Sequence, residues 1–192
     1  MTIEFKGYAI ASADGFIADD QGKMPDALRF EADWAYFQAA LDAADLTLLG
    51  RHTHEAAPNI KRRLRLVVSR RVRAVMQEDA STWWVNPSEV TPVSAITVVS
   101  GSKAKVAVVG GTGVFDWILN EGVFRAFHLS IAHHVRLGAG RPLFGDTDSI
   151  DGALASLETS GLTLESRSWL DREAGLELVV LRRRKKTDAD AD

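Results

Sequence analysis

The chain has 192 residues and contains no cysteine. This absence excludes disulfide bonds, thiolate nucleophiles, and zinc or iron–sulfur sites with cysteine ligands. No apolar run approaches the roughly 18 residues that a membrane-spanning helix requires. Positive charge is not in excess, because the formal net charge is −3, which argues against nucleic acid as the main partner. The N-terminus also lacks the features of a signal peptide. The sequence therefore predicts a cytoplasmic protein that binds neither membranes nor nucleic acid.

Histidines are the main remaining candidates for metal ligands, and their spacing does not favour a site. They occur as an alternating pair, an adjacent pair and a single residue (His52 and His54, His133 and His134, His128). Neither pair converges on a tetrahedral site, and no cysteine is present to complete one. We therefore expect no metal site.

The hydrophobic periodicity predicts strands that alternate with helices. Strands are expected at residues 5–12, 46–49, 64–69, 82–85, 105–109, 125–132, 162–169 and 176–183, and helices at 27–43 and 114–120. Residues 19–26 and 138–145 are expected to be loops. This order indicates an α/β fold with a mostly parallel central sheet, helices on both faces and an antiparallel C-terminal hairpin. We expect a single domain over residues 1–183 and a disordered charged tail at 184–192.

The strongest local motif is a buried strand that leads directly into Gly110-Gly111-Thr112-Gly113 and a helix beginning at Val114. Such a turn presents backbone N–H groups and a helix N-terminus to a phosphate, and glycine lets the anion approach the main chain closely. Thr112 could add a hydroxyl donor. The alternative is a tight turn that binds nothing. The GxGxxG spacing is absent and no acidic residue ends the next strand, so an NAD-type Rossmann site is not favoured.

Two further strand ends carry groups that suit a phosphate. Gly50-Arg51-His52-Thr53 follows one predicted strand, and Ser69-Arg70-Arg71 ends another. The planar guanidinium group of arginine donates two parallel hydrogen bonds to a phosphate. Three such strand ends predict a long polyanionic ligand, and the cations at the third favour NADP over NAD.

The best candidate for a catalytic group is Asp33 on the first predicted helix. The helix carries an apolar stripe of Phe30, Trp34, Phe37 and Leu41, and Asp33 lies roughly 70° from the middle of that stripe. Desolvation beside an apolar cleft would raise the pKa of the carboxyl group, which suits a proton donor to a substrate nitrogen. The alternative is an aspartate in water on the flank of the helix.

Six segments together resemble the dihydrofolate reductase superfamily in order and spacing. They are AIASADGFIA, ADWAYF, LTLLGRHTHE, RLRLVVSRR, VAVVGGTGVFDWIL and FHLSIA. SADGFIA and GAGRPLFGD are also similar to the reductase domain of the bifunctional deaminase/reductase of riboflavin biosynthesis. The resemblance covers about residues 5–145. It implies a dihydrofolate-reductase-like fold and an NADPH-dependent oxidoreductase that transfers hydride to a small pterin- or pyrimidine-type heterocycle.

The resemblance also implies roles for particular residues. The pyrophosphate of NADPH would lie against Gly50, Arg51, His52, Thr53, Gly110, Gly111, Thr112, Gly113 and Val114. Ser69 and Arg70 would face the adenosine 2′-phosphate, and Ala9, Ile10 and Ile17 would flank the nicotinamide. The substrate would contact Asp33, Phe37, Arg63 and Ser130, with Asp33 assisting protonation.

The chain departs from both groups at positions that concern the substrate. Pro25 is followed by Asp26 where dihydrofolate reductases carry a tryptophan, and the segment EAAPNIKRR matches neither group. Two alternatives therefore stay open. One is a riboflavin-type reductase of a phosphorylated ribosylaminopyrimidine, and the other is a nucleotide-binding protein without efficient catalysis. Exposed strand edges in such a fold could pair two copies into a homodimer.

Overall fold

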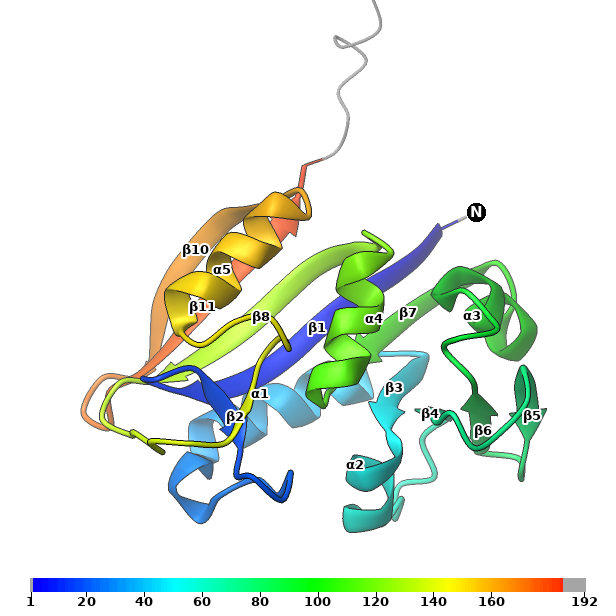
Figure 1. The fold of residues 1–192 in the computed structure, drawn as a ribbon, viewed down its shortest axis with the longest axis horizontal. Coiled ribbons are helices and arrows are strands. Elements are labelled where there is room, and N and C mark those ends of the chain that lie inside the picture. The colour runs from blue at the N-terminus through cyan, green and yellow to red at the C-terminus, as the bar shows by residue number, and fades with distance from the viewer. Residues whose placement is uncertain (1, 185–192) are drawn as a thin grey trace, which may run out of the picture.

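A twisted nine-stranded sheet runs through residues 2–184, which are the residues described by the computed structural model (Figure 1). Its spatial order is β10-β11-β8-β1-β7-β3-β4-β6-β5. The strands are β1 (Thr2–Ser12), β3 (Leu46–Gly50), β4 (Arg65–Val68), β5 (Val75–Gln77), β6 (Thr82–Val85), β7 (Lys103–Val108), β8 (Phe124–Ala132), β10 (Leu162–Asp171) and β11 (Leu176–Arg183). A separate two-stranded ribbon pairs β2 (Phe16–Ala18) with β9 (Arg141–Pro142).

The six central strands, from β8 to β6, are parallel, and the sheet becomes antiparallel at both edges. At one edge β11 pairs antiparallel with β8, and β10 pairs antiparallel with β11. At the other edge β5 pairs antiparallel with β6. This arrangement confirms the predicted fold class, including the C-terminal hairpin. Because the central strands are parallel, their carboxyl ends lie along one edge of the sheet.

Helices cover both faces of the sheet, as predicted. They are α1 (Glu31–Asp42), α2 (Arg51–Ala56), α3 (Pro92–Ser100), α4 (Thr112–Asn120) and α5 (Ile150–Thr159). In Figure 1, α4 and α5 lie in front of the sheet and α1 lies behind it. The main core joins the front face to α3, α4 and α5 through residues such as Ile96, Phe115 and Leu157. A smaller apolar cluster behind the sheet contains Ile10 and Leu28.

The close packing of β1 against β8 explains why glycine stands at position 7. A Cβ atom built on Gly7 would lie 2.3 Å from Cδ2 of Phe127 and 3.1 Å from Cε1 of Phe124. Both phenylalanines are fully buried. Gly7 therefore leaves room for two aromatic rings that are part of the main core.

The predicted first helix begins four residues too early. Residues Asp26–Leu28 form a short 3₁₀ helix, η1, and Arg29 and Phe30 are extended before α1 starts at Glu31. Leu28 is completely buried against the rear cluster, so its packing fixes a separate turn there. Trp34 was expected in the apolar stripe, but its side chain is 60% exposed. The prediction was wrong on both points because tertiary packing overrode the helical periodicity.

Several elements were not predicted from the sequence. They are α3 and α5 together with the short strands β2, β5 and β9, of which β9 lies within the glycine-rich segment expected to be a loop. Both helices carry side-chain caps, from Thr91 and Ser149, that the sequence analysis did not use. Residues 185–192 of the expected tail lie outside the described part of the chain. Within the described part, no helix is both long and apolar enough to cross a membrane.

Candidate functional site

The three strand ends predicted to hold phosphate are brought together by the order of the sheet. The glycine turn follows β7, Gly50-Arg51 follows β3, and Ser69-Arg70 follows β4, and these strands are consecutive neighbours. All three are parallel, so the segments leave the sheet at the same edge. The expectation that three neighbouring β-segments present their donors together therefore agrees with the topology.

The first two turns touch each other directly. The backbone N–H of Gly50 donates to the carbonyl of Gly110 over 2.9 Å. A Cβ at Gly50 would lie 3.4 Å from Cγ2 of Val114 and 3.7 Å from the Gly110 oxygen. The peptide bond between Gly110 and Gly111 is cis, and Gly110 has φ +102°, a conformation that favours glycine. The pair of turns forms one continuous backbone surface at the edge of the sheet.

The N-terminus of α4 is open at this surface. Its N-cap is Gly111, which provides no side-chain hydrogen bond to the first turn. A Cβ at Gly111 or at Gly113 would meet nothing within 4 Å. The first N–H groups of an α-helix have no partner within the helix, so this end offers donors to a ligand. Protein packing does not require glycine at position 113, so the main chain of this turn stays open to close approach.

Thr112 does not provide the free hydroxyl donor that was expected. Its Oγ1 donates to the carbonyl oxygen of Pro142 on β9 over 2.6 Å. This bond ties the start of α4 to the ribbon of β2 and β9. The hydroxyl proton of Thr112 is therefore used to hold the turn, and the backbone N–H groups carry the donor role.

Cationic groups gather beside these turns. Arg51 donates two hydrogen bonds to Glu55, at 2.8 and 2.9 Å, and its Nη2 lies 2.6 Å from Nε2 of His52. The hydrogen bonds from Arg51 lower the pKa of Glu55 most strongly, and Coulombic interactions with His52 and Arg71 lower it further. Residues from α2 and from the end of β4 thus act on the same carboxylate. Thr53, the fourth residue of the GRHT motif, lies in the same helix and is partly buried.

At the third strand end, Ser69 is 8% exposed and Arg70 is exposed. The Ser69 hydroxyl accepts a hydrogen bond from the backbone N–H of Arg71 over 3.2 Å. This bond shapes the turn and leaves the Ser69 hydroxyl proton available to donate. The arrangement suits a monoester phosphate at the outer end of the site.

β1 separates from β7 beyond residue 7, next to these turns. The two strands pair from Thr2 to Gly7, whereas β1 continues to Ser12 paired only with β8. Ala9 and Ile10 lie in this second half of β1, and Ile17 lies on β2 against the main core. These three residues therefore adjoin the region where the sheet divides, where the resemblance places the nicotinamide.

A carboxylate fixes the loop next to β2. Asp14 accepts hydrogen bonds from the Ser12 hydroxyl (2.6 Å) and from the backbone N–H groups of Leu137 (3.1 Å) and Gly138 (2.8 Å). Although burial would raise its pKa, these bonds hold the pKa below its usual range. This aspartate was not among the site residues predicted from the sequence. Its pairing with residues more than 120 positions away could not be found from local pattern.

Asp33 projects from α1 toward Ser130 on β8. Burial raises the pKa of Asp33, and a hydrogen bond with the Ser130 hydroxyl lowers it in part. Ser130 is 2% exposed and lies beside Ile10 in the register of β8 against β1. The carboxyl group is thus partly desolvated, as predicted, and it adjoins the half of β1 assigned to the nicotinamide.

One turn further along α1, a second polar pair joins the helix to β8. The hydroxyl of Tyr36 lies 2.6 Å from Nδ1 of His128, and the His128 ring stacks on Tyr8 with a centroid distance of 4.8 Å. Burial lowers the pKa of His128 to about 4, with further lowering by Lys6 and Arg182. The imidazole is therefore neutral at physiological pH. The sequence analysis missed this cluster, although Tyr36 and His128 lie three and two positions from Asp33 and Ser130.

Two aromatic residues, Trp34 and Phe37, follow Asp33 on α1. Trp34 is exposed, and its ring lies 5.9 Å from that of Phe37, at a tilt of 48°. An exposed tryptophan packed against a neighbouring ring presents a flat apolar surface on the same helix as Asp33. Phe37 was expected to bind substrate, whereas Trp34 was assigned to the core.

Arg63 is held by side chains of α1. Its Nε lies 3.2 Å from Oδ1 of Asp42, its Nη2 also bonds that oxygen, and Nη2 donates to Oε1 of Gln38 over 2.9 Å. Lys61 adds a second cation to Asp42. The side of Arg63 that carries Nε and Nη2 is therefore engaged within the protein.

The comparisons with known proteins bear on the fold. No protein-family model matches the chain, and no curated protein matches it. Among 295 matching chains of solved structures is a protein from Shewanella sp. PV-4 that is provisionally assigned to riboflavin biosynthesis. The TM-score is 0.66 at 20% sequence identity, with 95% of this chain and 99% of the other covered. The two proteins share a fold over almost their whole lengths.

Proposed function

We propose that the protein is an NADPH-dependent reductase acting on a small heterocycle. The observation that supports this most strongly is the meeting of three parallel strand ends, each bearing phosphate donors, beside the divided part of β1 and the desolvated Asp33. A dinucleotide phosphate needs anion-binding groups spread along an extended path, and a hydride acceptor needs a nearby proton source. One edge of this sheet offers both.

The residues present fit NADPH. The backbone N–H groups at the start of α4 would hold the pyrophosphate, with the positive charge of Arg51, whose Nη1 is bonded to Glu55, beside them. Ser69 and Arg70 would hold the 2′-phosphate. Ala9, Ile10 and Ile17 would line the nicotinamide pocket. The cofactor, when bound, supplies the hydride. The contribution of the protein is to position the reactants and to control the proton.

Asp33 is the proposed proton source. Its raised pKa keeps a larger fraction of the carboxyl group protonated near neutral pH than in a solvated aspartate. The group can then donate a proton, directly or through a water molecule, to the nitrogen or oxygen of the C=N or C=O bond whose carbon receives the hydride. Ser130 on β8 would orient the carboxyl group of Asp33 by a hydrogen bond.

The substrate that the geometry favours is a heterocycle of the riboflavin type, a phosphorylated ribosylaminopyrimidine. Trp34 and Phe37, on the same helix as Asp33, offer a flat apolar surface for a ring. Arg63, which would bind the carboxylate of a folate, is already engaged by Asp42 and Gln38. The provisional assignment of the Shewanella protein to riboflavin biosynthesis points the same way. Dihydrofolate is the second candidate, on the strength of Asp33 and Ser130.

Two measurements test the proposal. Isothermal calorimetry should detect binding of NADPH and NADP, with NADH binding at least tenfold more weakly because it lacks the phosphate that Ser69 and Arg70 would bind. The loss of NADPH absorbance should then follow addition of the ribosylaminopyrimidine phosphate more readily than of dihydrofolate. Binding without turnover of either substrate would indicate a nucleotide-binding protein, and no binding at millimolar cofactor would refute the proposal altogether.

We also propose that the long edge strand β10 pairs two copies into a homodimer. β10 is ten residues long, its outer edge is not paired within the sheet, and Leu164 and Trp169 are exposed on it. An unpaired edge of this length is a template for a further strand. Light scattering should give twice the monomer mass of 21.0 kDa, and replacing Leu164 by lysine should restore the monomer.

A further inference from the structure

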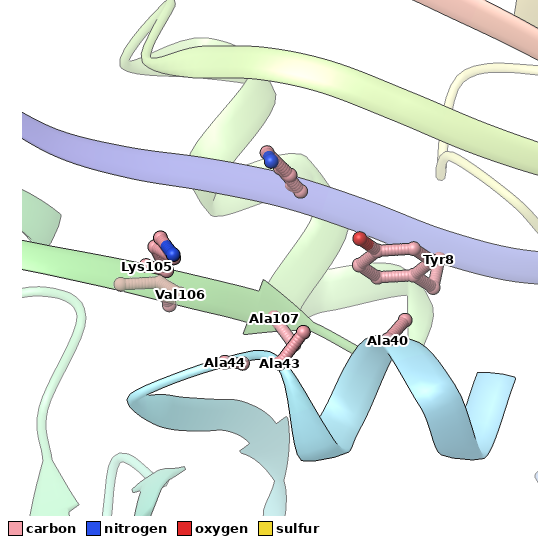
Figure 2. Close-up of a pocket in the computed structure, with 8 residues that line it drawn as sticks. Tyr8, Ala40, Ala43, Ala44, Lys105, Val106 and Ala107 are labelled. Atoms are coloured by element: carbon pink, nitrogen blue, oxygen red, sulfur yellow. The ribbon is translucent and has the colours of Figure 1, made fainter.

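A shallow hollow lies between the second half of α1 and the rear face of the sheet, away from the three phosphate turns. Lys6 and Tyr8 of β1 and Lys105 and Ala107 of β7 line one side, and Ala40, Ala43 and Ala44 line the other (Figure 2). Its volume is about 130 Å³. With ~30 Å³ for each water in the liquid, this corresponds to roughly four water molecules, which is room for one small ion or head group.

Hydrogen-bond donors dominate the polar lining of the hollow. Lys6 on β1 and Lys105 on β7 supply two ammonium groups from adjacent parallel strands. In the register of these strands, Lys6 pairs with Ala107 and Lys105 pairs with Glu4. The pKa of Tyr8 is raised to about 12, mainly by burial, so its hydroxyl keeps its proton at neutral pH. An ammonium group cannot accept a hydrogen bond. All three side chains that line the hollow with polar groups can therefore donate hydrogen bonds.

Three alanines at the end of α1 and directly after it create the space. They recur at positions 40, 43 and 44, which is the helical spacing of one face, and Figure 2 shows Ala40 beneath the ring of Tyr8 with Ala43 beside Ala107. A larger side chain at any of these positions would project into the hollow. Tyr8 is fixed above it by stacking on His128. The hollow is thus shaped by residues held in place by their own packing.

Negative charges nearby limit how tightly an anion could bind. Glu4 lies 3.6 Å from the ammonium group of Lys6, and the carboxylate of Asp45 accepts the backbone N–H of Lys105. The last carbonyl groups of α1 add a partial negative charge. Lys6 is therefore shared with Glu4, whereas no ion pair involving Lys105 occurs in residues 2–184. We expect affinity in the millimolar range.

We propose that this hollow binds a small phosphate dianion, either free phosphate or the phosphate of a monoester, between Lys6, Lys105 and the Tyr8 hydroxyl. Lys105 and Lys6, which is shared with Glu4, would supply charge-assisted hydrogen bonds, and the Tyr8 hydroxyl would donate to a further oxygen. Because the hollow shares no residue with the three phosphate turns, it does not depend on the proposed cofactor. It would be a second anion site, on the opposite side of Tyr8 and His128 from Asp33 and Ser130 along the strands.

Amide NMR spectra of the ¹⁵N-labelled protein test this directly. Inorganic phosphate and glycerol 3-phosphate are titrated separately, with sodium chloride at matched ionic strength as the reference. We expect saturable shifts centred on residues 6–8, 40–44 and 105–107 with both phosphates and not with chloride. Tighter binding of glycerol 3-phosphate would support a phosphorylated metabolite as the ligand, and equal binding would support free phosphate. Shifts that do not saturate, or that chloride reproduces, would overturn the proposal.

Matched variants locate the binding. Lys105→Gln removes one ammonium group and Ala40→Leu fills the space without changing charge, and each should weaken phosphate binding at least tenfold. Lys103→Gln, on the same strand, and Ala39→Leu, at an exposed position of the same helix, are the controls and should bind as the wild type does. Equal binding by all four variants would refute the site.

The titration is repeated with saturating NADPH. Shifts in the hollow should persist, since the cofactor turns lie elsewhere, whereas any shifts of residues 110–114 should vanish. If NADPH itself does not bind, the proposed function fails, but the behaviour of the four variants still decides whether the hollow binds phosphate.

Discussion

Replacing Gly113 by alanine tests whether the turn before α4 binds a ligand or has only a structural role. The position is the second residue of α4, its backbone is not left-handed, and an added Cβ would meet nothing within 4 Å. Alanine favours an α-helix over glycine by about 0.8–1.0 kcal/mol in the helix interior. Thermal unfolding should therefore show an unchanged or higher Tm. For a chain of this size, 1 kcal/mol corresponds to about 2–4 °C.

Cofactor binding should change in the opposite direction. In an α-helix each Cα–Cβ bond tilts toward the N-terminus, so the new methyl group would project to where the proposed pyrophosphate meets the backbone N–H groups. We expect NADPH affinity to fall at least tenfold, which is about 1.4 kcal/mol. A fluorescence titration of NADPH measures this loss in the same sample whose stability has been determined.

Gly152→Ala provides the control for removing a glycine from the first turn of a helix. This glycine is the third residue of α5, and its Cβ would lie 3.2 Å from Oγ of Ser149. The substitution should change stability slightly and leave NADPH affinity unaltered. Wild-type NADPH affinity in the Gly113→Ala variant would show that no phosphate lies against this helix end, and the argument from the open glycines would be refuted.

Three further substitutions follow from the buried groups. Burial raises the pKa of Asp33 in the folded state, so the wild type loses stability as pH rises from the unfolded value of about 3.9 through the folded pKa; the Asp33→Asn variant lacks this loss. Urea unfolding should therefore show that the stability of the Asp33→Asn variant, relative to the wild type, increases with pH over that window. The turnover of this variant should fall at least tenfold, and its NADPH affinity should be unchanged. Ser130→Ala removes an interaction that lowers the pKa of Asp33, so that pKa should rise. The limb of the pH–rate profile on which activity is lost as Asp33 deprotonates should therefore move to higher pH. An unmoved profile would remove Asp33 from proton transfer. Gly7→Ala forces a methyl group against Phe127 and should cost about 1–3 kcal/mol in urea unfolding, whereas a smaller cost would mean that the ring can move aside.

The sequence predicted the sheet better than it predicted the helices. The buried parallel strands are continuous apolar runs bounded by glycine or by charged residues. Such runs can be recognised in the sequence without knowing which strands lie next to them. The helices α3 and α5 were missed because their apolar residues sit in short windows between predicted strands. Trp34 was misassigned because a periodic stripe says which residues share a face but not how far the core extends along it.

Within the candidate site, local chemistry was predictable and partners were not. The sequence supplied the glycine turn and Asp33, because each is defined by residue types at short spacing. It could not show that the Thr112 hydroxyl donates to Pro142, or that Arg63 is engaged by Asp42, since both contacts join segments separated by about 20 to 30 positions. Contacts of this kind decide which donors remain free for a ligand.

The helix α1 connects Asp33, near its start, with the hollow at its end. Asp33, Tyr36, Ala40 and Ala43 recur at intervals of three and four, so the carboxyl group, the phenol and the hollow lie along one side of a single rigid rod. Tyr36 fixes that rod to β8 through His128, midway between Asp33 and the alanines. Tyr36 and His128 therefore lie between the hollow and the proposed proton donor, and the chain uses one helix to position both.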